Sequence, residues 1–109
     1  MLLPWSKMGM KIAKGGIGTM KPLEQCRMEI DELDSKIVDL LCRRIYVTNE
    51  MAETKKAQGV PIYDQMREEL LRRRVRQLAG TEYEEIVAEI YETIITESKK
   101  QQMQRYFEG

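Results

Sequence analysis

Apolar side chains recur at alternating spacings of three and four residues through the middle of this chain, the pattern of one face of an α-helix. Arg44 occupies a position in this series where a further aliphatic residue is expected. Because an unpaired guanidinium in an apolar environment is costly, Arg44 must meet a carboxylate, another chain or an anionic ligand. We call the series the apolar stripe; it consists of Ile30, Leu33, Ile37, Leu40, Val47 and Met51.

The pattern predicts an all-α fold in which the first of three helices is very long. This helix covers about residues 22–58, because Pro22 suits a first helical turn and Gly59 followed by Pro61 stops it. At 1.5 Å per residue its roughly 36 residues span about 54 Å, whereas a compact globule of this size is about 30 Å across. One copy would leave much of the apolar stripe bare, so the pattern favours a twofold homodimer with intertwined long helices.

Two shorter helices are predicted after the first. The second begins after Asp64, a favourable N-cap, and ends near residues 79–80. Thr81 is predicted to cap the third helix. The apolar face of the third helix consists of Tyr83, Val87, Ile90, Tyr91, Ile94 and Ile95.

Residues 1–19 differ in composition from the rest, and we interpret them as a disordered extension preceding a domain at residues 20–109. They hold four of the seven glycines, the one Trp and no acidic side chain, with no apolar run long enough for a signal peptide or a membrane span. An alternative is that the natural chain starts at Met20, because the sequence at residues 14–16, Lys-Gly-Gly, can be encoded by a purine-rich stretch like a bacterial ribosome-binding site.

Composition narrows the chemistry. The 109 residues include 18 basic and 18 acidic side chains, so the formal charge gives no general attraction to nucleic acid or to a membrane surface. Histidine is absent, and two cysteines, Cys26 and Cys42, cannot form a metal site alone. Roughly 24 Å of helix separates these cysteines, so they cannot pair within the chain, and a reducing, cytoplasmic setting is expected.

Two further cations on the long helix are candidates for the site of Arg44. Lys55 lies about 20° around the helix from Arg44, with the Cα atoms roughly 16 Å apart, so the two side chains could hold a small polyanion. Arg27 lies about 100° away and could more easily reach into a partner's pocket than into its own. A solvated surface position is the alternative explanation for Lys55 and Arg27.

Other polar residues have both ordinary and functional explanations. Asp64 and Glu68 can serve as an N-cap and as a carboxylate favoured by the helix dipole. Ser98 and Gln102 replace apolar residues on the inward face of the third helix, where fraying near the terminus is the alternative. The arginine-rich run at residues 72–76 is expected to be a solvated face, because consecutive helix positions point in different directions.

Taken in order, these positions resemble the all-helical (AroQ-type) chorismate mutases over about residues 22–104. The joint spacing carries the resemblance, since no single piece is specific. It implies the type II chorismate mutase fold and its intertwined homodimer. The short link at residues 80–81 departs from the family pattern and touches none of the matched residues. The matching motifs are Arg27-x-x-Ile30-x-x-Leu33-Asp34, Leu40-Leu41-x-x-Arg43-Arg44, Lys55, Gly59-x-Pro61-Ile62-x-Asp64-x-x-Arg67-Glu68 and Ser98-x-x-x-Gln102.

The resemblance implies rearrangement of chorismate to prephenate, a step in the biosynthesis of aromatic amino acids. This unimolecular pericyclic shift needs no cofactor, metal or nucleophile. The protein has to hold the flexible dianion in its reactive chair and stabilise the charge that develops as the ether C–O bond breaks.

The resemblance also assigns roles to the charged residues. Arg44 and the other subunit's Arg27 would clamp the two carboxylates, because guanidinium groups match carboxylates in a bidentate way. Ser98 would add a hydrogen bond to a carboxylate, and Arg67 would supply further positive potential.

The remaining matched residues would contact the rest of the substrate. Lys55 and Gln102 would face the ether oxygen, where negative charge develops, and so stabilise the transition state specifically. Glu68, with the backbone near Asp64, would hold the ring hydroxyl.

Two alternatives to a mutase stay open at this level. An isochorismate pyruvate-lyase shares the fold and the cationic clamp, although Glu68 and Gln102 match the mutase pattern. A non-catalytic dimeric helical module would instead pair Arg44 with a glutamate across its interface.

Overall fold

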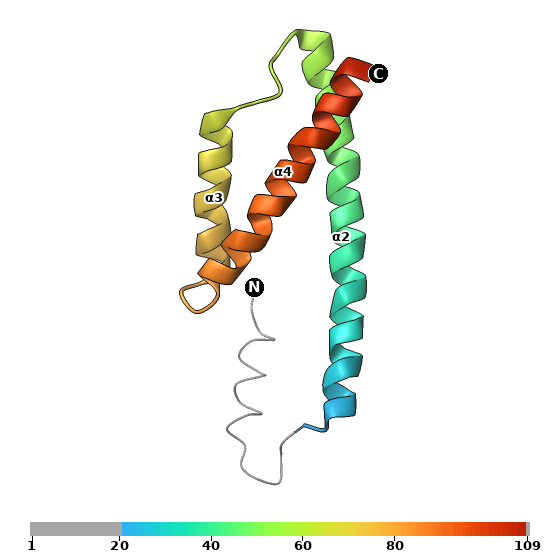
Figure 1. The fold of residues 1–109 in the computed structure, drawn as a ribbon, viewed down its shortest axis with the longest axis vertical. Helices are drawn as coiled ribbons and strands as arrows, with labels where there is room; N and C mark the ends of the chain where they lie inside the picture. Colours follow the sequence, from blue (N-terminus) through green and yellow to red (C-terminus); the bar gives the residue numbers. More distant parts are fainter. Residues whose placement is uncertain (1–20, 109) are drawn as a thin grey trace. The chain divides into compact units, whose positions relative to one another are not determined.

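The computed structural model describes residues 21–108, so the extension expected at residues 1–19 and the alternative start at Met20 lie outside the described residues. The described part forms α2 (Leu23–Gln58), α3 (Gln65–Ala79) and α4 (Glu84–Glu108) (Figure 1). It contains no strand. The prediction of three helices with a very long first one is therefore confirmed.

The predicted stop of the first helix and start of the second are also confirmed. After α2, Gly59 adopts a φ of 69°, a left-handed conformation that favours glycine, and the Val60 N–H donates to the carbonyl oxygen of Lys55 (2.8 Å). Asp64 is the N-cap of α3, and its carboxylate accepts a hydrogen bond from the Arg67 backbone N–H (3.1 Å).

The start of the third helix was predicted wrongly at Thr81. Residues 81–83 form a turn instead, in which the Tyr83 N–H donates to the Gly80 carbonyl (3.2 Å), and α4 begins at Glu84. The Val87 N–H then donates to the Tyr83 carbonyl (3.0 Å) as the helical pattern begins. This turn reverses the direction of the chain between α3 and α4. A single capping residue cannot produce such a reversal.

Much of the apolar stripe is exposed to solvent in the single chain, as the sequence predicts. The helix α2 is divided between two units of the chain, one ending at Leu40 and the other beginning at Leu41. In both units the residues of the stripe are exposed, with exposed fractions from 42% at Met51 to 57% at Leu40. Apolar side chains exposed along one helix face over this length are typical of an interface.

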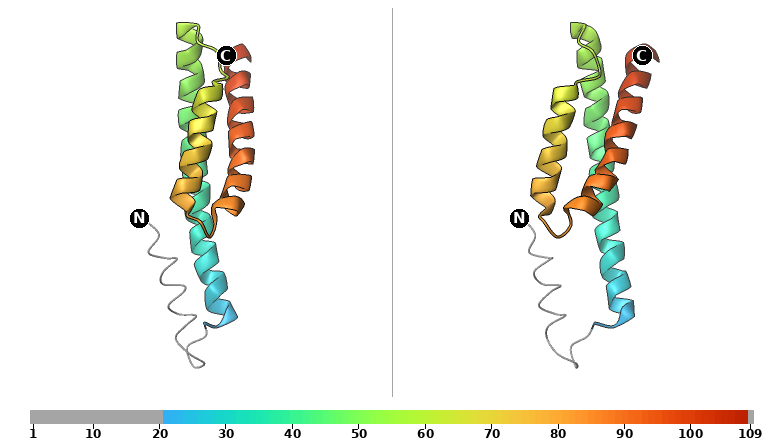
Figure 2. Two further views of the ribbon diagram at one scale, coloured as in Figure 1. Left: turned by 90° about the vertical axis from the view of Figure 1, so that its left-hand side faces the viewer. Right: turned by 60° about the vertical axis from the view of Figure 1, so that its left-hand side comes forward.

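The second unit contains the carboxyl-terminal part of α2 together with α3 and α4. The end of α3 lies beside the start of α4, and the carboxyl end of α4 lies beside the end of α2 (Figures 1 and 2). Among the described residues, only Ala52, Val75 and Ile95 are buried apolar side chains. The core of one copy is therefore small, and each of the three helices contributes to it.

Ion pairs join α3 and α4. Arg72 donates through Nε to Glu92 Oε2 (2.7 Å) and through Nη2 to Glu92 Oε1 (3.2 Å). Arg76 lies 3.4 Å from Glu84 and 2.9 Å from Glu85. Arg72 and Arg76 stay partly exposed, in keeping with the solvated face expected at residues 72–76. Their ion pairs were not predicted, because periodicity along one helix does not reveal carboxylates on its neighbour.

The Arg72–Glu92 pair makes the stability of the protein depend on pH. The hydrogen bond from Arg72 lowers the pKa of Glu92 below its ordinary value of 4.5. A carboxylate with a depressed folded pKa adds stability above its unfolded pKa and loses that contribution as the pH falls through the folded value. Because Glu92 is 48% exposed, screening limits the contribution to below about 1 kcal/mol.

We therefore expect Glu92→Gln to lower the free energy of unfolding near pH 7 and to lower it by a smaller amount at pH 3. Urea unfolding at fixed protein concentration between these pH values measures the difference. Glu82→Gln is the control, because Glu82 is exposed and forms no ion pair within residues 21–108. An equal difference between Glu92→Gln and the parent at every pH would contradict the assignment.

Candidate functional site

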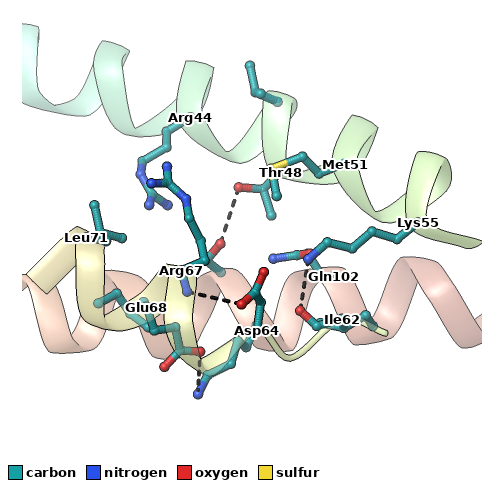
Figure 3. Close-up of a pocket in the computed structure, with 14 residues that line it drawn as sticks. Arg44, Thr48, Met51, Lys55, Ile62, Asp64, Arg67, Glu68, Leu71 and Gln102 are labelled. Carbon is teal, nitrogen blue, oxygen red and sulfur yellow. Dashed lines mark hydrogen bonds and ion pairs between the residues drawn. The ribbon is translucent and has the colours of Figure 1, made fainter. Parts of the chain in front are cut away.

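A pocket lies between the carboxyl-terminal part of α2, the first turns of α3 and the second half of α4 (Figure 3). It encloses roughly 240 Å³, a volume suited to a small metabolite. The structure brings together in this pocket every predicted site residue of the second unit. These residues are Arg44, Lys55, Asp64, Arg67, Glu68, Ser98 and Gln102.

Arg27 is the predicted site residue that lies in the other unit. It is exposed and belongs to the first turns of α2. Its assignment to the pocket of a second copy stays a prediction.

The ammonium group of Lys55 is held by two neutral oxygen atoms. Nζ donates to the main-chain carbonyl of Ile62 (2.9 Å) and to Oε1 of Gln102 (2.8 Å). Both acceptors fix the position of the ammonium group without cancelling its charge. Lys55 can therefore present a full positive charge, already oriented, to a ligand in the pocket.

Gln102 contributes a donor next to this ammonium group. Its side chain is buried, with 6% exposed. Fraying of the helix end therefore does not explain why this position is polar. Because Oε1 accepts from Lys55, the amide nitrogen points away from Lys55 into the pocket (Figure 3). Lys55 and Gln102 together offer two adjacent donors to a single acceptor atom of a ligand.

Arg44 has no carboxylate partner within residues 21–108. Its Cζ atom lies 5.8 Å from the centroid of the Tyr91 ring, which attracts a cation without neutralising it. Arg67 approaches from α3, and its guanidinium group and that of Arg44 both extend into the pocket (Figure 3). Two like charges that converge on a cavity favour an anion between them.

Ser98 is held by a residue that the sequence interpretation missed. The hydroxyl oxygen of Ser98 lies 3.3 Å from that of Thr48, and Thr48 is buried with 5% exposed. Thr48 follows Arg44 by one helical turn, so a polar side chain on the inward face of α2 was the available signal. With Thr48 as the donor, the hydrogen bond orients Ser98 and leaves the Ser98 O–H to donate to a ligand.

The two carboxylates of the pocket have different surroundings. Asp64 is exposed, and its carboxylate caps α3 by accepting from the Arg67 backbone N–H. Glu68 is only 12% exposed and lies within ion-pair distance of Arg72 Nη2 (3.3 Å) and Lys99 Nζ (3.1 Å). Of the two, Glu68 is the less exposed acceptor and is better suited to a hydroxyl group.

The charges of the pocket favour a small polyanion. Four cationic side chains and two carboxylates line it, and both carboxylates already have partners within the chain. Within residues 21–108, no group of three His, Cys, Asp or Glu side chains is arranged to hold a metal ion. The four cationic side chains are Arg44, Lys55, Arg67 and Lys99.

Besides Thr48, the sequence interpretation missed Lys99 and the apolar wall. Lys99 follows Ser98 directly, and its charge gave no signal that could separate it from the exposed Lys100. The side chains of Val47 and Met51 show that part of the apolar stripe faces this pocket. The apolar wall consists of Val47, Met51, Ile62, Leu71 and Ile95.

None of the helices in the described range is both long enough and apolar enough to cross a membrane.

Comparison with known proteins gives a family match and one curated relative. A family model described as chorismate mutase type II matches residues 26–103. A chorismate mutase of Methanocaldococcus jannaschii is 33% identical to this chain over 87 residues, which cover 78% of this chain and 88% of the relative. No solved structure gives a significant match.

Proposed function

Since this chain belongs to the type II chorismate mutase family, we propose that its pocket rearranges chorismate to prephenate. The family match at residues 26–103 supports placing the catalytic domain at residues 20–109. The product is a precursor of aromatic amino acids, so the proposed role is in their biosynthesis. The observation that carries the proposal is the Lys55 ammonium group, held by neutral oxygens beside the Gln102 amide.

The reaction breaks an ether C–O bond and forms a C–C bond within one molecule. As the C–O bond lengthens ahead of C–C formation, negative charge develops on the ether oxygen. Lys55 and Gln102 would donate hydrogen bonds to this oxygen and so bind the transition state more tightly than the substrate. Because the acceptors of Lys55 already fix its position, little reorganisation is needed during the reaction.

The arginines would bind the two carboxylates of the substrate. Arg44 would hold one carboxylate in a bidentate pair, with Ser98 adding a hydrogen bond and Arg67 adding positive potential. Arg27 of a second copy would hold the other. This clamp would keep the flexible substrate in its compact conformation. The binding energy of the clamp would offset the conformational entropy that the substrate loses.

Glu68 would bind the ring hydroxyl of the substrate. Its carboxylate is only 12% exposed, and a carboxylate can accept several hydrogen bonds at once. The backbone near Asp64 would complete this end of the pocket. The contact would be the same in the substrate and in the transition state, since the hydroxyl group takes no part in bond breaking.

We further propose that the active protein is a homodimer in which the apolar stripes of two copies of α2, apart from the pocket-lining Val47 and Met51, pack against each other. The exposure of the stripe and the small core of one copy support this arrangement. The free, exposed cysteines Cys26 and Cys42 fit a reducing compartment, so the proposed location is the cytoplasm.

Incubation of the purified chain with chorismate tests the proposed reaction. We expect saturable conversion to prephenate without added metal or cofactor. Isochorismate is supplied in a separate reaction, in which a pyruvate-lyase would release salicylate and pyruvate. Loss of chorismate no faster than in buffer would contradict the proposal, and faster turnover of isochorismate would favour the lyase.

A further inference from the structure

We propose that Lys99 is a positioning residue that holds the Glu68 carboxylate in place for the ring hydroxyl of the substrate. The inference rests on the proposed function, since the hydroxyl contact belongs to it. Lys99 lies on α4, whereas Glu68 lies on α3, and both line the pocket. The ion pair between them therefore connects α3 to α4 at the wall of the pocket.

The Glu68 carboxylate is held at both oxygen atoms. Oε1 lies 3.3 Å from Arg72 Nη2, and Oε2 lies 3.1 Å from Lys99 Nζ (dashed line at Glu68 in Figure 3). Arg72 belongs to the same helix and is itself held by Glu92. Lys99 is thus the contact with Glu68 that comes from α4, and the pair fixes the rotation of the carboxylate.

Lys99 is itself held from a second side. Its ammonium group lies 5.0 Å from the centroid of the Tyr63 ring, in the segment between α2 and α3. The ring attracts the cation but does not neutralise it, so the charge remains available to Glu68. A lysine fixed between a ring and a carboxylate loses less freedom when a ligand binds than a solvated lysine does.

Removal of Lys99 would leave Glu68 with Arg72 on its own helix. The carboxylate could then rotate, and the substrate hydroxyl would have to order it during binding. Because the hydroxyl contact is the same in substrate and transition state, this loss raises KM and leaves kcat nearly unchanged. We expect Lys99→Met to raise KM about three- to tenfold, the effect of weakening one hydrogen bond to a charged group.

Lys99→Arg and Lys100→Met are the matched comparisons. Arginine keeps the charge and can reach Glu68, so we expect the KM of Lys99→Arg to be close to that of the parent. Lys100 is the neighbouring lysine, exposed and paired with Glu97 (3.1 Å), and its replacement should leave KM and kcat unchanged. Far-ultraviolet circular dichroism and thermal unfolding of each variant separate a local effect from loss of the fold.

A double-mutant cycle with Glu68→Gln tests whether Lys99 acts through Glu68. We expect Lys99→Met to change kcat/KM little when Glu68 is already replaced, as measured at high enzyme concentration. Full additivity would overturn the proposal and indicate direct contact between Lys99 and the substrate. A lower KM for Lys99→Met would also overturn it, because Lys99 would then compete with the hydroxyl for Glu68.

The failure of this inference is distinguishable from failure of the proposed function. If the parent protein rearranges chorismate and Lys99→Met has unchanged KM, only the role of Lys99 is wrong. If the parent protein leaves chorismate untouched, the proposed function itself is wrong.

Discussion

Lys55→Ala is expected to lower kcat by about 10²- to 10³-fold, the usual cost of losing one preorganised donor to a developing oxyanion. The substitution removes the charge that would face the ether oxygen. It also leaves the Ile62 carbonyl and Oε1 of Gln102 without their donor, so the Gln102 amide can turn out of position. KM should change less than kcat, since the interaction strengthens as charge develops.

Two other cations provide controls for this measurement. Lys56 is the exposed neighbour of Lys55 on α2, and Arg74 is exposed on α3. Neither residue lines the pocket, so alanine at either position should leave kcat within about twofold of the parent, as is usual for exposed surface sites. If Lys55→Ala and Arg74→Ala were equally active, the assignment of Lys55 would be wrong.

Mixing two inactive variants, Arg27→Ala and Arg44→Ala, is expected to restore activity. Alone, each variant loses one arm of the carboxylate clamp, and we expect a fall in kcat/KM of about 10²-fold or more. If each pocket combines Arg44 of one copy with Arg27 of the other, a mixed dimer has one intact pocket. Random exchange between equal amounts therefore restores about a quarter of the parent activity, by the symmetry of a twofold interface.

The pair Arg44→Ala and Lys55→Ala is the matched control for this mixture. Both residues line the pocket of one copy, so each pocket of a mixed dimer would still lack one of them. Mixing this pair should restore no activity. Native mass spectrometry confirms that subunits have exchanged. Mixed dimers of Arg27→Ala and Arg44→Ala without recovered activity would show that no pocket is shared between copies.

Local rules predicted most of the helix boundaries. Gly59 ends α2 and Asp64 caps α3 because each residue satisfies main-chain groups within a few positions of itself. The start of α4 was missed because it depends on the reversal that brings α4 back onto α3. The partners of Arg72 and Arg76 were missed for the same reason, since Glu92 and Glu85 are neighbours only after the helices have packed.

The candidate site was predictable where a polar residue broke an apolar pattern. Arg44 and Gln102 stood out in this way, and the structure places both in one pocket. Lys99 did not stand out, because its position next to Ser98 fits a solvated lysine equally well. The contact between Arg44 and the Tyr91 ring was also beyond sequence reasoning, since it depends on the crossing of α2 and α4.

One of the two acceptors that hold Lys55 belongs to the main chain, which affects how this site tolerates mutation. Replacing the Ile62 side chain leaves its carbonyl oxygen in place, so many residues at position 62 are compatible with a correctly placed ammonium group. Substitution of Gln102, by contrast, removes its acceptor directly. The carbonyl can be lost only through a change in the path of the loop, and Gly59, with its φ of 69°, helps to fix that path. Evolutionary constraint at this end of the pocket should therefore fall on a glycine that never touches the substrate.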